Sequence, residues 1–407
     1  MTSRSDQPGR LVQPGRSVQS GQSDQSVQPG LSVQPVRSVQ PDQSDQSERS
    51  VRPGRALVVG TGLIGGSVGL ALVSRGWRVH GYDTDPARTA EALERGALSD
   101  AGDDPEAEIV FVATPSSAVA EVARALLGDP ARRSDLVVTD VSGVKASVVG
   151  AVSHPRFVGG HPMAGSEQVG LDGADAGLFT GALWVLTPAQ DTDLGAFSKV
   201  RDVVSSLGAD VVALGPADHD RLVAVVSHVP HLVAATLMNA AADGAAQDAV
   251  LLRLAAGGFR DMTRVAAGHP GIWPDVCADN AEAITGALDK VIADLQAMRD
   301  RVRDGDRAGM LRVLERASRA RRRLPARGVR PEQLAEVRVP VTDREGVLAE
   351  LTAVAGDLGI NIYDIEIAHS PEGPRGVLLL VVGAEDAEKL RAAVAVRGYR
   401  ATAQAIS

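Results

Sequence analysis

A glycine-rich turn at residues 60–65 constrains the fold of this chain more than any other feature. The apolar run 56–59 leads into G-T-G-L-I-G, a helical pattern follows, and a second short strand ends at Asp83. Glycines let the backbone approach a pyrophosphate, whose charge is favoured at a helix N-terminus. An acid about 20 residues downstream accepts from the ribose hydroxyls. The stretch therefore predicts a Rossmann-type dinucleotide site, and because a carboxylate repels a 2′-phosphate it favours NAD over NADP.

The alternation of strand and helix patterns continues from residue 54 to residue 215. Short apolar runs predict further strands at 108–114, 135–141, 157–161, 183–186 and 210–214. This alternation predicts a parallel, doubly wound α/β sheet, which binds ligands beyond the carboxyl ends of its strands. The expected cofactor-binding residues at those ends are Gly60, Gly62, Leu63, Ile64, Gly65, Asp83, Thr114 and Pro115.

Three other segments flank this domain. Residues 1–53 repeat Ser-Val-Gln and Gln-Pro-Gly units, which predicts disorder, either as a functional tail or as an extension upstream of a start near Val51. Helical periodicity over 216–324 predicts an all-α domain, whose alanine-rich faces favour a dimer. After a linker at 325–333, residues 334–407 have the strand and helix order of a ferredoxin-like βαββαβ unit.

Charge and composition exclude several classes of protein. The net charge of −9 argues against non-specific binding to nucleic acid or to an anionic membrane. The single cysteine, Cys277, excludes an intramolecular disulfide and fits a reducing compartment. No apolar run approaches the roughly 20 residues of a membrane span, and no secretory signal is evident. We expect a soluble cytoplasmic protein with a small-molecule substrate.

A histidine flanked by glycines lies at the end of a predicted strand. Residues 156–167 have the sequence R-F-V-G-G-H-P-M-A-G-S-E, in which Pro162 biases His161 towards an extended backbone. Alone, this pattern also fits a surface histidine in a turn. At the mouth of a strand, however, His161 is placed as a proton acceptor would be.

Two polar stretches stand out in the predicted helical domain. They are S-H-V-P-H at 227–231 and F-R-D-M-T-R at 259–264. His228 and His231 lie three residues apart, but without clustered acids or cysteines the sequence predicts no metal site. We expect a helix N-terminus beside Ser227 that binds a substrate anion together with Arg264.

Taken together, these motifs resemble those of the prephenate dehydrogenase family. The resemblance rests on the glycine motif, G-G-H-P-M-A-G-S-E around His161, S-H-V-P-H, and G-G-F-R-D-M-T-R at 257–264, and it covers about residues 55–324. The C-terminal unit, with loops at 343–346 and 359–361, is similar to an ACT domain.

The resemblance implies the oxidative decarboxylation of prephenate to 4-hydroxyphenylpyruvate, with hydride transfer to NAD⁺, in tyrosine biosynthesis. It implies that His161 accepts the proton of the ring hydroxyl and that Arg264 binds a substrate carboxylate. Asp261 would orient that guanidinium or touch the nicotinamide. It further implies a homodimer and a tyrosine or other amino-acid effector. The residues that would assist substrate binding are Ser227, His228 and His231.

One turn departs from the family pattern. Family members carry an Asp-x-Gly-Ser-Val-Lys-like turn whose serine contacts the substrate hydroxyl and the nicotinamide. Here Asp140-Val-Ser142-Gly143-Val-Lys145 has the serine and glycine exchanged. Either the turn shifts so that Ser142 reaches the site as a catalytic residue, or a water molecule replaces the serine.

Three other functions compete with this interpretation. Arogenate dehydrogenase performs the same chemistry on an amino acid, and Glu167 would either pair with its amino group or bridge to an arginine. A non-catalytic NAD sensor governed by the ACT-like unit would leave His161, His231 and Arg264 without a role. A 3-hydroxyacid dehydrogenase would need a lysine from the helical domain, yet residues 200–289 contain none.

Overall fold

The computed structural model describes most of the chain from residue 51 to residue 405. Outside the described residues lie 1–50, Glu167, Val169, Gln247, Ala249, Arg323, 325–332, Asp343, 370–374 and 406–407. The expectations for the N-terminal segment, for Glu167 and for nearly all of the linker fall on these residues. They stay predictions.

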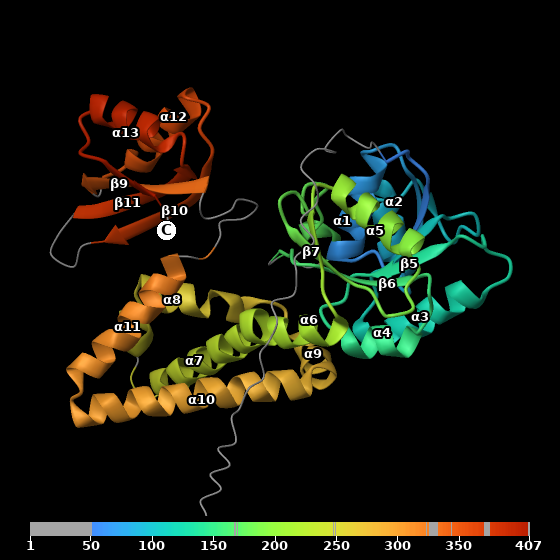
Figure 1. Cartoon of the computed structure of the whole chain (residues 1–407), viewed down its shortest axis with the longest axis horizontal. Coiled ribbons are helices and arrows are strands. Elements are labelled where there is room, and N and C mark those ends of the chain that lie inside the picture. Colours follow the sequence, from blue (N-terminus) through green and yellow to red (C-terminus); the bar gives the residue numbers. More distant parts are fainter. Residues whose placement is uncertain are drawn as a thin grey trace, which may run out of the picture. The chain divides into compact units, whose positions relative to one another are not determined.

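An eight-stranded sheet forms the first domain (Figure 1). Its strand order is β3-β2-β1-β4-β5-β6-β7-β8. The strands are β1 (Arg55–Val59), β2 (Arg78–Tyr82), β3 (Asp100–Ala101), β4 (Ile109–Val112), β5 (Val137–Asp140), β6 (Phe157–Pro162), β7 (Leu183–Thr187) and β8 (Asp210–Ala213). Because the strand order reverses between β1 and β4, a crevice opens beyond their carboxyl ends. The predicted doubly wound α/β fold is confirmed.

The prediction of an entirely parallel sheet is wrong at one pair of strands. All pairs from β3 to β6 are parallel, as is β7 with β8, but β7 runs antiparallel to β6. A parallel pair needs a crossover, usually a helix. Between β6 and β7 the described residues form only a single 3₁₀ turn, Gly170–Gly173.

Helices cover both faces of this sheet, and this explains the nearly continuous apolar runs of its strands. They are α1 (Leu63–Val73), α2 (Pro86–Glu94), α3 (Ser116–Gly128), α4 (Ala146–Val152) and α5 (Leu194–Ser206). Val58 and Phe111 pack with α1 and α5 on one face. Leu57 and Val110 pack with α3 and α4 on the other. The site described below therefore stands on a core buried from both sides.

The second domain is helical throughout the residues that the structure describes (Figure 1). Its elements are α6 (Pro216–Val223), the π-helical turn η2 (Ala224–His228), α7 (Val229–Ala245), η3 (Leu251–Leu254), α8 (Gly257–Thr263), η4 (Arg264–Ala267), η5 (Pro270–Ile272), α9 (Trp273–Asp279), α10 (Ala281–Asp304) and α11 (Arg307–Arg322).

The predicted helix N-terminus beside Ser227 is wrong. Residues 216–245 form one continuous helix, and Ser227 lies within its π-helical turn. Pro230 has no N–H to donate, which breaks the regular ladder, and π turns commonly occur where a helix adjusts around a functional site. The structure therefore has no free helix N-terminus at this position to bind the expected anion.

This helix is also long and apolar enough to cross a membrane, judged by length and composition alone. That result differs from the expectation that no apolar run approaches such a length. Its first half, however, carries His219, Asp220 and His228, whose polar side chains are buried against neighbouring elements. Helices of globular domains also pass this test, and 28% of the most apolar window of this helix is buried within the protein.

The C-terminal region forms a four-stranded antiparallel sheet with two helices. Its elements are β9 (Leu334–Thr342), α12 (Val347–Asp357), β10 (Ile362–His369), β11 (Arg375–Gly383), α13 (Ala387–Val396) and β12 (Thr402–Ala405). The strand order is β10-β11-β9-β12, and Val337, Leu351 and Leu390 belong to its core. The predicted βαββαβ order of elements is thus observed.

Candidate active site

The crevice between β1 and β4 is shaped by glycines. Gly60 has a φ of +94°, and a β-carbon there would lie 2.6 Å from the Ala113 carbonyl oxygen. A β-carbon on Gly65 would overlap the Gly60 carbonyl oxygen. Only glycine fits at both positions, so α1 starts directly against the end of β1. Half-buried Thr114 and exposed Pro115 follow β4 on the other side of the crevice.

Gly62 differs from its two neighbours because a β-carbon there would meet no protein atom within 4 Å. It is the N-cap of α1, and no side chain caps this helix end. Leu63 and Ile64 form the first turn beside it, half-buried. Free N–H groups at an open helix N-terminus suit a pyrophosphate. The predicted glycine motif therefore has the geometry that a dinucleotide requires.

Asp83 follows β2, and its carboxylate faces the glycine turn. Its oxygens accept from the backbone N–H of Thr61 (2.8 Å) and of Asp85 (3.0 Å). Partial burial raises the pKa of Asp83, but these two hydrogen bonds and the nearby Arg88 outweigh it, so the pKa falls below its usual value. An ionised, half-buried acceptor fits ribose hydroxyls and disfavours a 2′-phosphate.

His161 lies within β6, with a half-buried side chain. Its pKa is well below the usual value of 6.5 because burial disfavours the cation and because the Lys145 ammonium and His219 lie nearby. A neutral imidazole can accept a proton. The structure thus gives His161 the protonation state of a base.

Ser142 does not occupy the position expected of a catalytic hydroxyl. Its buried Oγ donates to the Asp140 carboxylate and accepts from Lys145 Nζ at 2.9 Å. The residue beside His161 is Gly143, where a β-carbon would lie 3.7 Å from Nε2. The turn therefore does not shift to bring Ser142 to the site, and the exchange of serine and glycine leaves space beside the imidazole.

Lys145 was not predicted as part of the site. It is fully buried, and its ammonium donates to the Asp140 carboxylate and to the Gly160 carbonyl oxygen (2.8 Å). Burial lowers the pKa of Lys145, while Asp140 acts in the opposite direction. The pair ties β5 to the strand that carries His161. The signal in the sequence was the turn from Asp140 to Lys145, but a lysine in a turn does not indicate that its side chain will be buried.

Asp220 and His219, at the start of the helical domain, were also missed. Both are buried. The two Asp220 oxygens accept from the N–H groups of Lys145 and Ala146, each at 2.8 Å, and so cap α4 from another domain. His219 lies against His161, with 2.9 Å between Nε2 of His219 and Nδ1 of His161. In the sequence, the only sign of a role for these residues was that a histidine and an aspartate are adjacent. That sign does not indicate that His219 contacts His161, which lies 58 residues away.

The predicted substrate residues of the long helix lie in different surroundings. Ser227 is half-buried, whereas His228 is buried and its Nδ1 lies 3.2 Å from the side-chain nitrogen of Asn280. His231 stacks on Trp273, with ring centroids 3.7 Å apart. Burial lowers the pKa values of both histidines. His228 is thus part of the packed network, and His231 is half-buried beside an aromatic ring.

Asp261 and Arg264 lie on successive turns, α8 and η4, and both are exposed. The turn η4 packs against α7. Gly268, just after η4, approaches His231, since a β-carbon there would lie 3.9 Å from the imidazole Cε1. The structure therefore brings the segment of Arg264 to the helix that carries His231. Among the described residues, no group of three histidine, cysteine or acidic side chains is arranged to hold a metal ion.

Two family models match the chain. Residues 68–213 match "Prephenate dehydrogenase, nucleotide-binding domain", and residues 215–316 match "Prephenate dehydrogenase, dimerization domain". The boundary between the matches coincides with the change from the sheet to the long helix. The first match supports an NAD-binding domain.

Known relatives agree with the family models. The chain is 33% identical to the prephenate dehydrogenase of Bacillus subtilis over 342 residues, which are 81% of this chain and 92% of that protein. The structure resembles Synechocystis arogenate dehydrogenase (33% identity, TM-score 0.58, 66% and 98% of the two chains). It also resembles Aquifex aeolicus prephenate dehydrogenase in complex with hydroxyphenyl propionate and NAD⁺ (28% identity, TM-score 0.63, 67% and 99%).

Replacing Gly62 by alanine tests the cofactor crevice. Because the added methyl meets no protein atom, Gly62→Ala is expected to fold with an unchanged melting temperature. The methyl occupies the space of the pyrophosphate, so NAD⁺ affinity should fall by about tenfold or more. Fluorescence titration and thermal unfolding measure the two quantities. Gly128→Ala, at an equally open position away from the crevice, is the control, and equal NAD⁺ affinity in both variants would contradict the assignment.

Proposed function

The chain belongs to the prephenate dehydrogenase family, and we propose that it converts prephenate to 4-hydroxyphenylpyruvate and CO₂ in tyrosine biosynthesis. NAD⁺, when bound, accepts the hydride. The observation that carries the proposal is a neutral, half-buried His161 on the domain that binds the dinucleotide. We assign residues 54–215 to cofactor binding, 216–324 to substrate binding and dimerisation, and 334–407 to regulation.

In this mechanism His161 Nε2 accepts the proton of the ring hydroxyl as hydride leaves the same carbon. Loss of CO₂ then makes the ring aromatic, and the imidazolium returns its proton to the phenolate oxygen. A base with a lowered pKa suffices because aromatisation drives the reaction, and the protein chiefly aligns the reacting groups. A water molecule beside Gly143 takes the place of the family serine at the hydroxyl.

Substrate carboxylates are held by the helical domain. Arg264 is exposed, and guanidinium groups form bidentate contacts with carboxylates well. Ser227 and His231 assist it, while His228, buried beside Asn280, supports the helix. Asp261, one turn before Arg264, orients the guanidinium or touches the nicotinamide.

Arogenate is the second candidate substrate, because the chain shares 33% identity with an arogenate dehydrogenase of known structure. The two substrates differ only in the side chain, which is a keto acid in prephenate and an amino acid in arogenate. We therefore expect the protein group that distinguishes the two substrates to contact the substrate side chain, away from His161.

Initial rates with both substrates, in the wild type and in His161→Asn, test the proposed reaction. We expect turnover of prephenate with NAD⁺ and a fall in kcat of about 10²–10⁴-fold in the variant, with NAD⁺ affinity retained. Since only neutral His161 is a base and its pKa is lowered, the acid limb of kcat/KM should lie below pH 6.5. Turnover of arogenate alone would favour the second candidate, and an unchanged kcat would remove His161 from the mechanism.

Arg264→Gln tests the carboxylate contact. Loss of a charged hydrogen bond should weaken substrate binding by about 1.5–3 kcal/mol, seen as a raised KM with NAD⁺ affinity unchanged. Arg303→Gln, an exposed arginine near the end of α10 that pairs with Asp304, is the matched control. If both variants keep the wild-type kcat and KM, Arg264 does not bind the substrate.

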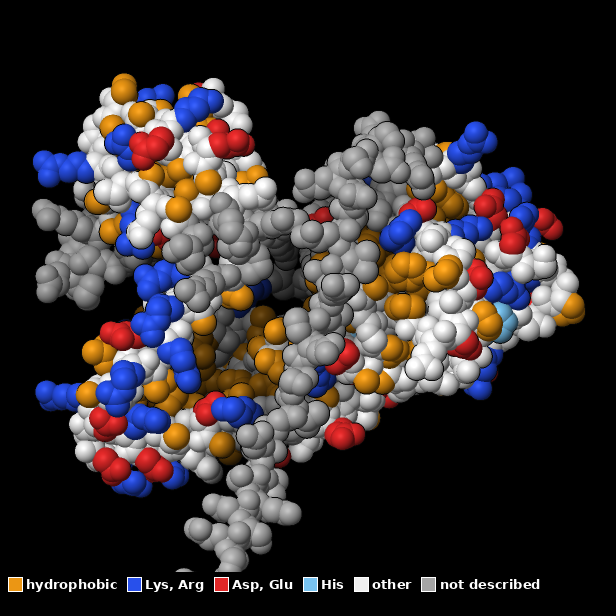
Figure 2. Space-filling model, in the orientation of Figure 1, with side chains coloured by type: hydrophobic (Ala, Val, Ile, Leu, Met, Phe, Trp, Pro, Cys, Tyr) orange, Lys and Arg blue, Asp and Glu red, His pale blue; other side chains and the backbone are white. Residues whose placement is uncertain are grey.

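We further propose a soluble, cytoplasmic homodimer built through the helical domain. Large apolar side chains are exposed along it, among them Val226 (68%), Leu254 (76%) and Val302 (70%). Figure 2 shows hydrophobic side chains gathered over these helices. Exposed apolar surface of this extent marks an interaction site, and the matching family model is that of a dimerization domain.

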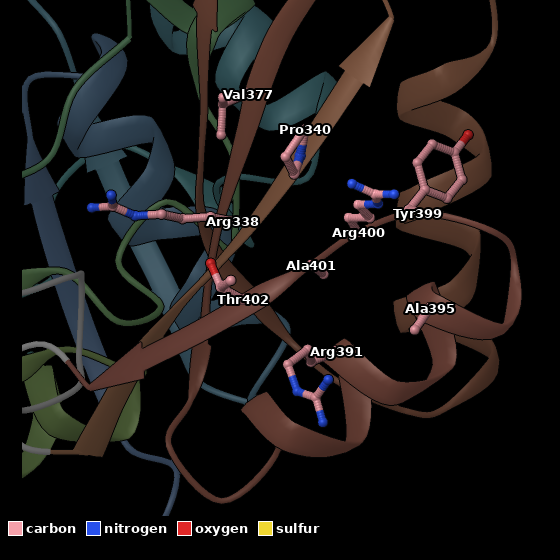
Figure 3. Close-up of a pocket in the computed structure, with 9 residues that line it drawn as sticks. All are labelled: Arg338, Pro340, Val377, Arg391, Ala395, Tyr399, Arg400, Ala401 and Thr402. Atoms are coloured by element: carbon pink, nitrogen blue, oxygen red, sulfur yellow. The ribbon is translucent and has the colours of Figure 1, made fainter.

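The C-terminal βαββαβ unit is proposed to be an ACT-like domain that binds tyrosine or another amino acid. Its β9–α12 loop is held by Arg344, which pairs with Glu350 and Tyr399. A groove of about 560 Å³ on the same unit is lined in part by Arg338, Arg391 and Arg400 (Figure 3). These guanidinium groups lie apart, and two of them pair with glutamates, so the groove is not built to grip a single anion.

Tyrosine inhibition tests the regulatory role. The full chain should lose activity at millimolar tyrosine, whereas a chain ending at residue 324 should keep its activity and ignore tyrosine. If tyrosine, phenylalanine and tryptophan all leave the full chain unaffected, the effector proposal fails.

A further inference from the structure

A chain of two hydrogen bonds, the first partly buried and the second buried, runs from His161 into the helical domain. Nδ1 of His161 lies 2.9 Å from Nε2 of His219, and Nδ1 of His219 lies 2.7 Å from Asp220 Oδ1. His219 is completely buried, and its ring meets that of His161 at 71°. Both nitrogens of His219 are therefore engaged, one with a base and one with an acid.

Asp220 fixes which nitrogens carry hydrogen. Burial raises the pKa of Asp220, but hydrogen bonds from His219 and from the Ala146 and Lys145 backbone outweigh it, so the pKa falls below its usual value. An ionised carboxylate only accepts, and hence Nδ1 of His219 must carry a hydrogen. In this tautomer of His219, Nε2 is the acceptor, and the hydrogen of His161 sits on Nδ1.

This arrangement leaves Nε2 of His161 with a free lone pair. Nε2 is also the nitrogen beside Gly143, at the open side of the ring. The other charged or titratable groups near the pair are Lys145, Asp140 and His228. The Lys145 ammonium is held by Asp140, and His228 interacts with Asn280. The hydrogen-bond chain thus aims the accepting nitrogen towards the substrate space.

We propose that His219 and Asp220 are positioning residues, which hold His161 in the tautomer that accepts the substrate proton and stabilise the imidazolium that forms. This inference rests on the proposed function of His161 as the base. Asp220 also caps α4, so the tautomer is correct only while the helical domain is docked on the sheet domain.

Asp220→Leu tests the chain because it removes both the acceptor that holds the hydrogen of His219 on Nδ1 and the negative charge. An amide at this position would not do so, because its oxygen can stay at the place of Oδ1 and accept from His219 and from the Lys145 N–H. In the leucine variant His219 Nε2 is free to donate to His161, whose hydrogen then sits on Nε2 and blocks the base, and no carboxylate stabilises the imidazolium. The expected result is a fall in kcat of about tenfold or more, with KM for prephenate and NAD⁺ affinity changed less than about threefold. A kcat within threefold of the wild type in the folded variant would overturn the proposal.

A pair of variants at His219 separates positioning from packing. His219→Gln keeps an oxygen acceptor near the place of Nε2, whereas His219→Met has a similar shape and no such acceptor. The glutamine variant should keep kcat within about tenfold, and the methionine variant should lose about 10²-fold or more. Equal losses in the two variants would mean that His219 acts only through packing. His154→Gln, a histidine outside the site, is the control.

Nitrogen-15 spectra of histidine-labelled full-length protein report the tautomer without any turnover. Wild-type His161 should carry its hydrogen on Nδ1, and in Asp220→Leu the tautomer with hydrogen on Nε2 should appear. A wild type with hydrogen on Nε2 would overturn the inference. Absence of turnover with both prephenate and arogenate would instead defeat the proposed function, so the two failures are distinguishable.

Discussion

The carboxylate of Asp220 joins the two halves of the candidate active site. It projects from the first helix of the helical domain and accepts from the N–H groups of Lys145 and Ala146, the N-cap and first residue of α4 in the sheet domain. A buried carboxylate is stabilised at a helix N-terminus, where it completes backbone groups that have no partner within the helix. The same carboxylate meets His219 and, through it, His161. Another hydrogen bond between the two domains is donated by the Ser116 hydroxyl of α3 to the Asp279 carboxylate of α9. It lies on the same side of the sheet domain.

The cofactor crevice and the base belong to one domain but depend on different physics. The crevice is made by the absence of side chains, because Gly60 and Gly65 permit contacts that no other residue allows. The base is made by burial and charge, since desolvation and the Lys145 ammonium keep His161 neutral. Lys145 in turn pairs with Asp140, so this ion pair adds to the effect of burial on the pKa of His161.

Local patterns were enough to predict most of the fold. The glycine turn, the alternation of elements and the βαββαβ order each depend on residues close together in sequence, and the structure has them. The antiparallel β7 was missed because its direction depends on the path of a connection rather than on its own residues. The π turn at Ser227 escapes this reasoning because the stretch S-H-V-P-H predicts a helix start, whereas the helix continues through Pro230.

The site was predictable only in part. His161 and the glycine motif follow from their own surroundings, whereas Lys145, His219 and Asp220 gain their roles from contacts between separate segments. Ser142 was predicted to be catalytic and is not placed so: its hydroxyl bonds to the Asp140 carboxylate, and the next residue, Gly143, lies beside the His161 imidazole.

The most direct test of this account is a crystal structure with NAD⁺ and 4-hydroxyphenylpropionate. The account predicts the phenolic oxygen at about 2.6–3.2 Å from His161 Nε2, with the carboxylate towards Arg264. A phenolic group directed away from His161, with Nε2 facing the protein interior, would contradict it.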